Sequence, residues 1–321
     1  MSQSLLTRLA AIAVILITGL TLTSYIAWNS YLELASHFKL QYLVVSLLCI
    51  LLLLIERRKK LLFIALFCIS IQSIEIIPWY FPPFWIGRSE THDLRILLSN
   101  VYVRNRSYEK VLSLVSEEKP DIAIFQEVAP DWAQQLQALS STFPYSFQIP
   151  NDQIIYSRFP LNRPALFGFV LKPSIAVNLT IDRQDITLVV THPLPPLPSF
   201  FESRNQQLLD VGRYIQQQKN PVILMGDLNT TMWSPYYHKL IQDTGLENAR
   251  NGFGLLPTWP VPNPYASTFL KRSPIASLFK IPIDHCLLNS LIKVTTIHSG
   301  PSVDSDHLPL IVDLAIPAKS A

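Results

Sequence analysis

The sequence predicts an α/β protein: a two-sheet α/β sandwich with outer helices, preceded by an N-terminal transmembrane helical region. Hydrophobic residues make up 49% of the 321 residues and charged residues only 15%, and the apolar excess lies before about Ile86. After that point, short strand-like apolar runs alternate with amphipathic helical stretches. Several strand pairs are too close in sequence for a helical crossover, which favours a mixed sandwich. We therefore expect residues 1–87 and 88–321 to form separate units.

Residues 1–87 are predicted to be a membrane anchor with two or three transmembrane helices. Uncharged apolar runs cover residues 9–32 and 40–55, and a third covers residues 61–74. A helix needs about 20 mostly apolar residues to cross a bilayer, which the first two runs reach with their flanks. The third is the weakest because Glu75 follows it directly. A cleaved signal peptide is less favoured for the first run, since no small-residue cleavage site follows it.

The basic residues predict how this anchor is oriented. Arg57, Arg58, Lys59 and Lys60 separate the second and third runs, which places that loop in the cytoplasm. Three crossings of the cell (inner) membrane would then carry the rest of the chain to the outer face, the periplasmic face in a Gram-negative bacterium. If the third run lies on the membrane instead, the C-terminal part faces the cytoplasm. The lipid bilayer is thus an expected partner, and nothing in the sequence indicates a protein partner.

The C-terminal part is expected to contain three helices and ten strands. Helical spacing of apolar residues predicts helices over residues 108–118, 130–139 and 200–217. Apolar runs bounded by polar turns predict strands over residues 94–100, 121–126, 154–156, 165–170, 175–181, 186–191, 222–225, 283–288, 293–298 and 308–314.

Polar side chains stand at the ends of these apolar strands. Taken singly, each is most simply a turn or helix-cap residue. Taken together they indicate a ligand-binding crevice, because polar groups at strand ends gather at one edge of a sheet. The residues concerned are Asn100, Glu127, His192, Asp227, Asn229, Asp284, Asp306 and His307.

The order of these residues resembles the endonuclease/exonuclease/phosphatase superfamily, and within it a bacterial membrane-anchored branch. The resemblance spans residues 94–314. It is carried by Gln126-Glu127, Thr191-His192-Pro193, Gly226-Asp227-Leu228-Asn229, Ile283-Asp284-His285 and Ser305-Asp306-His307-Leu308-Pro309. It implies that residues 88–321 are a catalytic domain, a metal-dependent phosphoesterase that uses Mg²⁺ (or Mn²⁺) to hydrolyse a phosphoester or phosphodiester bond.

The resemblance also implies a role for each residue. Hard oxygen ligands suit Mg²⁺, so Glu127 and Asp306 are the expected metal ligands, with Asn100 beside them as a metal or substrate ligand. Asp227 is expected to orient or deprotonate the attacking water, and Asn229 to bind phosphate or hold Asp227.

The two remaining roles belong to histidines. His307 is expected to pair with Asp284, which would favour its protonated form as a donor to phosphate. His192 is expected to be a second donor to the phosphate oxygens of the substrate.

Other notable residues are expected to be structural. His285 should face away from Asp284, since neighbours on a strand point to opposite faces. Trp233 and Trp259 are expected to pack in the core, with a substrate groove as the alternative. His238, His298 and Arg204 are expected at the surface. The cysteines are predicted to be buried and unpaired: Cys49, Cys68 and Cys286.

The substrate stays open at this stage between nucleic acid and a phospholipid or inositol phosphate. The net charge is only +3, and no basic run interleaved with aromatics favours DNA. A lipid headgroup is attractive for a domain tethered at a bilayer. A catalytically inactive, membrane-tethered ligand-binding module is the alternative function, but none of the core residues is missing.

Overall fold

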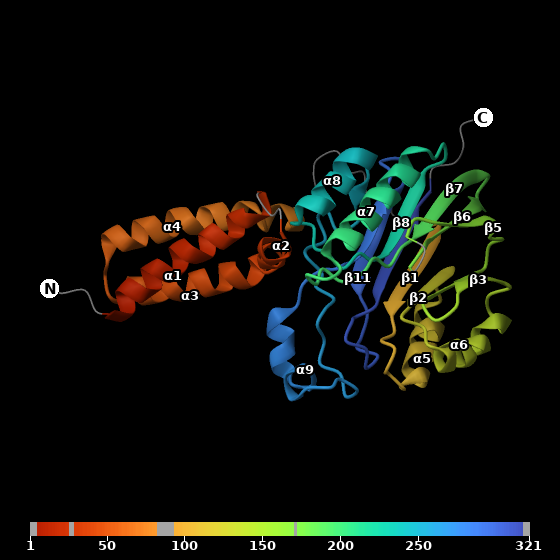
Figure 1. The fold of residues 1–321 in the computed structure, drawn as a ribbon, viewed down its shortest axis with the longest axis horizontal. Helices are drawn as coiled ribbons and strands as arrows, with labels where there is room; N and C mark the ends of the chain where they lie inside the picture. The colour runs from red at the N-terminus through yellow and green to blue at the C-terminus, as the bar shows by residue number, and fades with distance from the viewer. Residues whose placement is uncertain (1–4, 26–28, 82–92, 170–171, 317–321) are drawn as a thin grey trace.

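The computed structural model describes residues 5–25, 29–81, 93–169 and 172–316. Within them, an elongated N-terminal helical bundle projects from one side of an α/β domain (Figure 1). The predicted boundary between residues 87 and 88 lies outside the described residues.

Three helices run side by side in the bundle: α1 (Leu5–Leu22), α3 (Lys39–Ile55) and α4 (Lys59–Ile74). The short elements η1 (Thr23–Tyr25), α2 (Ser30–Ser36) and η2 (Ile77–Tyr80) lie at the end next to the domain. The predicted run over residues 9–32 is therefore not one helix. Asn29 caps a new helix, because its Oδ1 accepts hydrogen bonds from the backbone N–H groups of Tyr31 and Leu32, both at 3.1 Å.

The bundle has a small, partly polar interior and an apolar exterior. Val14, Leu53 and Ala65 are buried between the helices. Gln72 joins all three helices, since its Nε2 donates to Thr18 Oγ1 at 2.9 Å and to Ser46 Oγ at 3.0 Å. Large apolar side chains instead point outward from every helix, among them Leu5, Ile12, Leu16, Leu48, Leu51, Phe63 and Phe67.

By length and composition, one described helix can cross a bilayer. It is α1, and the pair α2 and α3, bent by 62° relative to each other, would make a second span if taken together. α4 has 16 residues and is shorter. The expected count of two or three spans stays a prediction.

Two six-stranded sheets form the C-terminal domain, as predicted. The first has the order β11-β12-β1-β2-β4-β3 and the second the order β5-β6-β7-β8-β10-β9. Among the strands of the described residues, only β1–β2 and β7–β8 pair in parallel. The strands are β1 (Leu94–Asn100), β2 (Ile122–Gln126), β3 (Tyr145–Ile149), β4 (Gln153–Ser157), β5 (Asn162–Phe167), β6 (Ser174–Ile181), β7 (Gln184–Val190), β8 (Val222–Asp227), β9 (Glu247–Asn248), β10 (Asp284–Leu288), β11 (Lys293–Ser299) and β12 (Leu310–Ala315).

Helices cover the outer faces of both sheets. α5 (Tyr108–Glu118) and α6 (Pro130–Leu136), followed by η3 (Gln137–Ser141), lie on the first sheet. α7 (Phe201–Gln216) and α8 (Pro235–Thr244) lie on the second. A long loop carries α9 (Phe269–Arg272) and η4 (Pro274–Phe279). The two sheets bury aliphatic side chains between them, so the strands are held in a fixed mutual orientation.

The bundle is joined to the domain by buried polar contacts. Glu33 of α2 forms an ion pair with Arg204 of α7, and both side chains are fully buried. Glu33 also accepts a hydrogen bond from Ser234 Oγ at 2.5 Å. The expectation that Arg204 is solvated is therefore wrong. α7 does expose its polar face, but α2 covers the part where Arg204 lies.

The structure places most of the other residues that were expected to be structural as predicted. His285 is buried on the opposite face from Asp284, within 2.9 Å of the Thr230 carbonyl oxygen, as expected. Trp233 is in the core, and His238 and His298 are exposed. The three cysteines are free, with Cys68 and Cys286 buried and Cys49 half-buried.

Candidate active site

Strand pairing brings the predicted polar residues to one edge of the sandwich. Asp284 at the start of β10 lies opposite Asp227 at the end of β8 in the antiparallel ladder. In the other sheet, Asn100 ends β1 opposite Gln126 of the parallel strand β2, and Glu127 follows. The site therefore lies across the gap between the two sheets, and each sheet contributes acidic or amide groups from its strand ends.

Gln126 links the two sheets beneath the site. Its Nε2 donates to the Thr191 carbonyl oxygen at 2.9 Å, and its Oε1 accepts from the Asp227 backbone N–H at 2.8 Å. Gly226 allows this approach, because with φ +151° a Cβ there would lie 1.8 Å from the Thr191 oxygen. A glycine is required before Asp227 for this reason.

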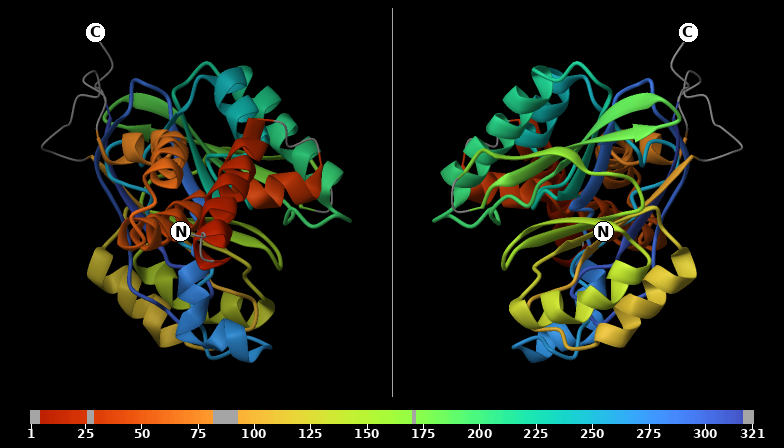
Figure 2. Two further views of the ribbon diagram at one scale, coloured as in Figure 1. Left: turned by 90° about the vertical axis from the view of Figure 1, so that its left-hand side faces the viewer. Right: turned by 90° about the vertical axis from the view of Figure 1, so that its right-hand side faces the viewer.

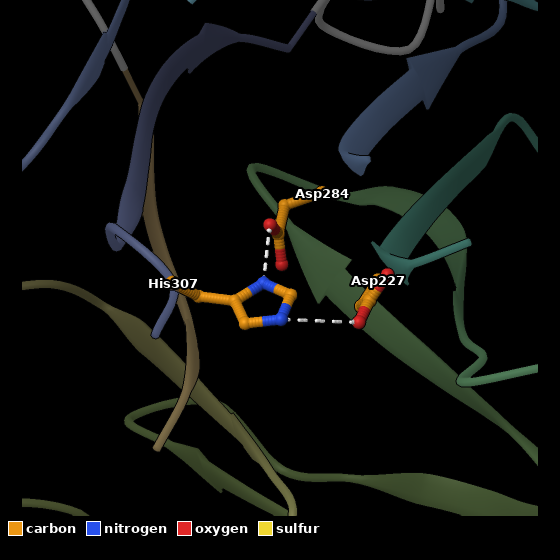
Figure 3. A group of neighbouring side chains, drawn as sticks. All are labelled: Asp227, Asp284 and His307. Carbon is orange, nitrogen blue, oxygen red and sulfur yellow. Dashed lines mark hydrogen bonds and ion pairs between the residues drawn. The ribbon is translucent and has the colours of Figure 1, made fainter. Parts of the chain in front are cut away.

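Asp227, Asp284 and His307 form a buried cluster (Figure 3). His307 Nδ1 lies 2.9 Å from Asp284 Oδ2, and its Nε2 lies 3.6 Å from Asp227 Oδ2. Burial alone would lower the pKa of His307, but the carboxylates of Asp284 and Asp227 outweigh it and raise the pKa to about 10. His307 is thus an imidazolium at neutral pH.

The pKa values of the two carboxylates of this cluster are shifted in opposite directions. Burial raises the pKa of Asp227 more than the positive charge of His307 lowers it. At Asp284, burial raises the pKa, yet the charge and hydrogen bond of His307 hold it below its usual range. Asp284 is therefore a fixed anion that orients His307, and Asp227 is the more basic of the two.

His192 also approaches Asp227 and has a carboxylate partner of its own. Its Nδ1 lies 3.0 Å from Asp152 Oδ1, and its Nε2 lies 3.8 Å from Asp227 Oδ2. Burial raises the pKa of Asp152, but the hydrogen bond and charge of His192 bring it below its usual value. Asp152 was not predicted from the sequence. The only signal was the polar Asn151-Asp152 pair directly before β4.

Glu127 and Asp306 line the same cleft, and the charge of Glu127 acts on the Asp306 carboxylate. Burial raises the pKa of Asp306, and the negative charge of Glu127 adds to that rise. Asp306 Oδ2 accepts from Trp259 Nε1 at 3.3 Å, while its buried Oδ1 has no hydrogen-bond partner among the described residues. An unpaired carboxylate oxygen beside a second carboxylate fits a hard divalent cation, so these residues suit Mg²⁺.

Asn100 and Asn229 hold the carboxylates in place. Asn100 Nδ2 donates to Glu127 Oε1 at 3.1 Å and lies 3.3 Å from Asp227 Oδ2, while its Oδ1 accepts from the Tyr102 N–H. In this arrangement its amide nitrogen faces the carboxylates, which suits a positioning role. The Asn229 backbone N–H donates to Asp227 Oδ1 at 2.8 Å, and its side chain donates to the Pro193 carbonyl oxygen.

A cleft of about 370 Å³ opens over these groups. Glu127, Asp227, Asp306 and His307 line its floor. Trp259 also lines it, so the groove alternative holds for this residue and the core expectation is wrong. The indole is kept there by its hydrogen bond to Asp306.

The chain belongs to the Endonuclease/Exonuclease/phosphatase family, whose model matches residues 97–307. This family contains phosphoesterases and nucleases, which are typically dependent on divalent metals, so the assignment supports hydrolase activity on phosphoester bonds. The resemblance to the superfamily is thereby confirmed, and the membrane-anchored branch within it stays a prediction. No curated protein matches the sequence.

Solved structures share this fold at low sequence identity. D. rerio TDP2 complexed with a single-strand DNA product is 17% identical, with a TM-score of 0.58, and the match covers 69% of this chain and 98% of that one. The human Nocturnin catalytic domain with bound sulfate is also 17% identical, with a TM-score of 0.55, over 74% and 100% of the two chains. A conserved protein of unknown function from Enterococcus faecalis V583 is 18% identical, with a TM-score of 0.56, over 70% and 100%.

Proposed function

We propose that this protein is a membrane-tethered, Mg²⁺-dependent hydrolase of phosphoester or phosphodiester bonds. The observation that carries the proposal is the convergence of Glu127 and Asp306 with the Asp227–His307–Asp284 cluster in one cleft. An inactive binding module would not need a histidine held as a cation beside a buried, more basic carboxylate. The phosphate belongs to a nucleic acid, as in the DNA product bound by D. rerio TDP2, or to a lipid or inositol headgroup.

Each residue has a task in such a reaction. In hydrolysis the water oxygen bonds to phosphorus and loses its proton to a base, the ester P–O bond breaks, and the departing oxygen takes up a proton from the solvent. Asp227 orients the water and accepts its proton, since its raised pKa makes it a better base. The Nε2 atoms of His307 and His192 both lie near Asp227 Oδ2. From there they donate hydrogen bonds to the phosphate oxygens and stabilise the negative charge that develops on them. Asp284 and Asp152 fix the orientation of the two imidazoles.

Glu127 and Asp306 would hold Mg²⁺, or Mn²⁺ in its place. A bound Mg²⁺ would act as a Lewis acid toward a phosphoryl oxygen. Asn100 keeps Glu127 at a fixed distance from Asp227, because its amide bonds to both carboxylates. The metal ligand and the base therefore keep a fixed position relative to the reacting phosphate.

The metal requirement can be tested with the full chain in nanodiscs and bis(p-nitrophenyl) phosphate as substrate. We expect chelation to reduce hydrolysis at least about a hundredfold, and added Mg²⁺ to restore it. Glu127→Gln keeps the shape of the side chain but removes the charge, and it should require a much higher Mg²⁺ concentration. Glu247→Gln is the control, because Glu247 lies on β9 at the edge of the second sheet. Hydrolysis that persists in chelator and in Glu127→Gln would contradict the metal assignment.

The bundle supports the tether. Its exterior is apolar and its interior holds the polar Gln72, Thr18 and Ser46, an arrangement suited to lipid rather than water. The start of α1 and the basic α3–α4 turn lie at the end remote from the sheets (Figure 1). If all three helices cross the membrane side by side, the basic residues lie on one side of the membrane and the catalytic domain on the other.

This topology predicts an external catalytic domain. An alkaline phosphatase fused after Ala321 should be active, since it matures only outside the cytoplasm, and a green fluorescent protein fused there should be dark. The expectation follows from the positive-inside rule applied to Arg57 to Lys60. A fluorescent fusion with an inactive phosphatase fusion would place the domain in the cytoplasm.

A further inference from the structure

We propose that the substrate phosphate is attached to an apolar chain, as in a membrane phospholipid, and that this chain lies in a groove formed jointly by the bundle and the catalytic domain. The inference rests on the phosphoesterase function proposed above and names the substrate class of the same site. It follows from what lines the cleft above its catalytic floor.

The cleft has one wall from each unit of the chain. Leu34 and Phe38, from the corner between α2 and α3, line the cleft together with Leu197 and Ile281 of the catalytic domain. These side chains offer no hydrogen bonds to a substrate. The catalytic groups below them are therefore reached past an apolar surface, part of which the bundle supplies.

The bundle wall is fixed to the domain. His37 Nδ1 lies 2.9 Å from Thr231 Oγ1, and both residues are buried. Gln41, in the first turn of α3, donates to the backbone oxygens of Lys280 at 2.9 Å and Leu278 at 3.2 Å. The groove thus has a defined width, and it lies where α3 leaves the domain and enters the apolar bundle.

The segment bound by Gln41 has the composition of a membrane-contacting surface. Phe269 is 84% exposed and Leu278 is 69% exposed, and both lie near Lys271 and Arg272. α9 lies on the side of the domain from which the bundle projects (Figures 1 and 2). Exposed apolar side chains with basic neighbours suit the headgroup layer of an anionic bilayer. The mouth of the groove would then open at the level of the lipid headgroups.

The charges of the cleft favour a lipid over a nucleic acid. Among the described residues that line it, Lys271 is the one lysine or arginine. A nucleic-acid strand needs several cations along its backbone and aromatic faces for its bases. A lipid needs contact with a single phosphate and an apolar wall, which Lys271, Leu34 and Phe38 supply.

The test measures how affinity depends on chain length, with the full chain in nanodiscs. Ethyl, butyl, hexyl and octyl phosphate are titrated by calorimetry in the presence of Mg²⁺, and also used as inhibitors of bis(p-nitrophenyl) phosphate hydrolysis. Each methylene buried in the groove should lower the dissociation constant about fourfold. Phe38→Ser and Leu197→Ser should flatten this dependence. Leu291→Ser, an exposed leucine remote from the cleft, is the matched control for partitioning into the nanodisc.

The outcomes separate the two proposals. Chain-length dependence that weakens in Phe38→Ser and Leu197→Ser, but not in Leu291→Ser, supports the lipid assignment. Equal affinity for all four phosphates overturns it, and so does hydrolysis of a single-stranded oligonucleotide faster than dioleoylphosphatidylglycerol in the disc. If the chromogenic ester is hydrolysed in either case, the phosphoesterase function still stands. If the full chain binds the alkyl phosphates but does not hydrolyse the chromogenic ester, the result contradicts the phosphoesterase function alone.

Discussion

Replacing Asp227 with asparagine should lower kcat for bis(p-nitrophenyl) phosphate about a thousandfold, while KM changes by only a few fold. Asp227 is the carboxylate that both His192 and His307 approach, at 3.8 and 3.6 Å, and its raised pKa makes it the strongest candidate base. A general base contributes about 10² to 10⁴ in rate. The asparagine keeps the size of the side chain and can still accept a hydrogen bond from the Asn229 N–H.

Two further variants show whether this loss is specific. Asp243→Asn removes an exposed carboxylate that pairs with Lys239 on α8, and it should leave kcat unchanged. Asp152→Asn reaches Asp227 through His192 and should lower kcat about tenfold. Asp227→Asn activity within tenfold of the wild type, with an unchanged unfolding midpoint, would remove Asp227 from the role of base.

The sequence was sufficient to predict the carboxylates that line this edge of the sandwich because of where they stand. Asp227, Asp284 and Glu127 each directly end or begin an apolar strand, and strand ends in a two-sheet sandwich meet at one edge. Their mutual distances follow from the pairing of β8 with β10 and of β1 with β2, which the sequence does not state. The family resemblance supplied the order, and the structure supplied the geometry.

What the sequence did not reveal depends on contacts between distant segments. Asp152 lies in a hairpin turn, where an aspartate is ordinary, and its partner His192 is 40 residues away. β3 was missed because most of its side chains are exposed, so it shows no apolar run. α8 was missed because it is short and begins at Pro235, although Ser234 caps it. In each case the residues that stabilise the element or side chain lie elsewhere in the sequence, so the local sequence pattern does not show them.

The joint between bundle and domain is the clearest such case. Arg204 lies on an amphipathic helix and was expected at the surface, and its local pattern gives no sign of a partner 171 residues away at Glu33. The structure buries both completely and pairs them. Because the pair connects two units, it explains why the bundle can contribute a wall to the cleft. A hinged anchor could not hold Leu34 and Phe38 at a fixed place over the site.

Breaking this pair from one side should be strongly destabilising. Glu33→Gln leaves the Arg204 guanidinium buried without its counter-charge, and Arg204→Met leaves the Glu33 carboxylate with only the hydroxyls of Ser234 and Thr230. We expect each single variant to lower the free energy of unfolding by about 3–5 kcal/mol. Thermal unfolding of the full chain in one detergent gives the comparison. Lys239→Met, which breaks an exposed ion pair on α8, should change stability by less than about 1 kcal/mol.

The double variant decides whether the two charges act as a pair. Glu33→Gln with Arg204→Met removes both charges, so no unpaired ion is left buried, and it should be clearly more stable than the sum of the single effects predicts. The chain-length dependence of alkyl phosphate binding should weaken in the single variants and recover in the double one. Strictly additive losses would show that Glu33 and Arg204 are not coupled, and the bundle wall would then have to be held by the contacts of His37 and Gln41 alone.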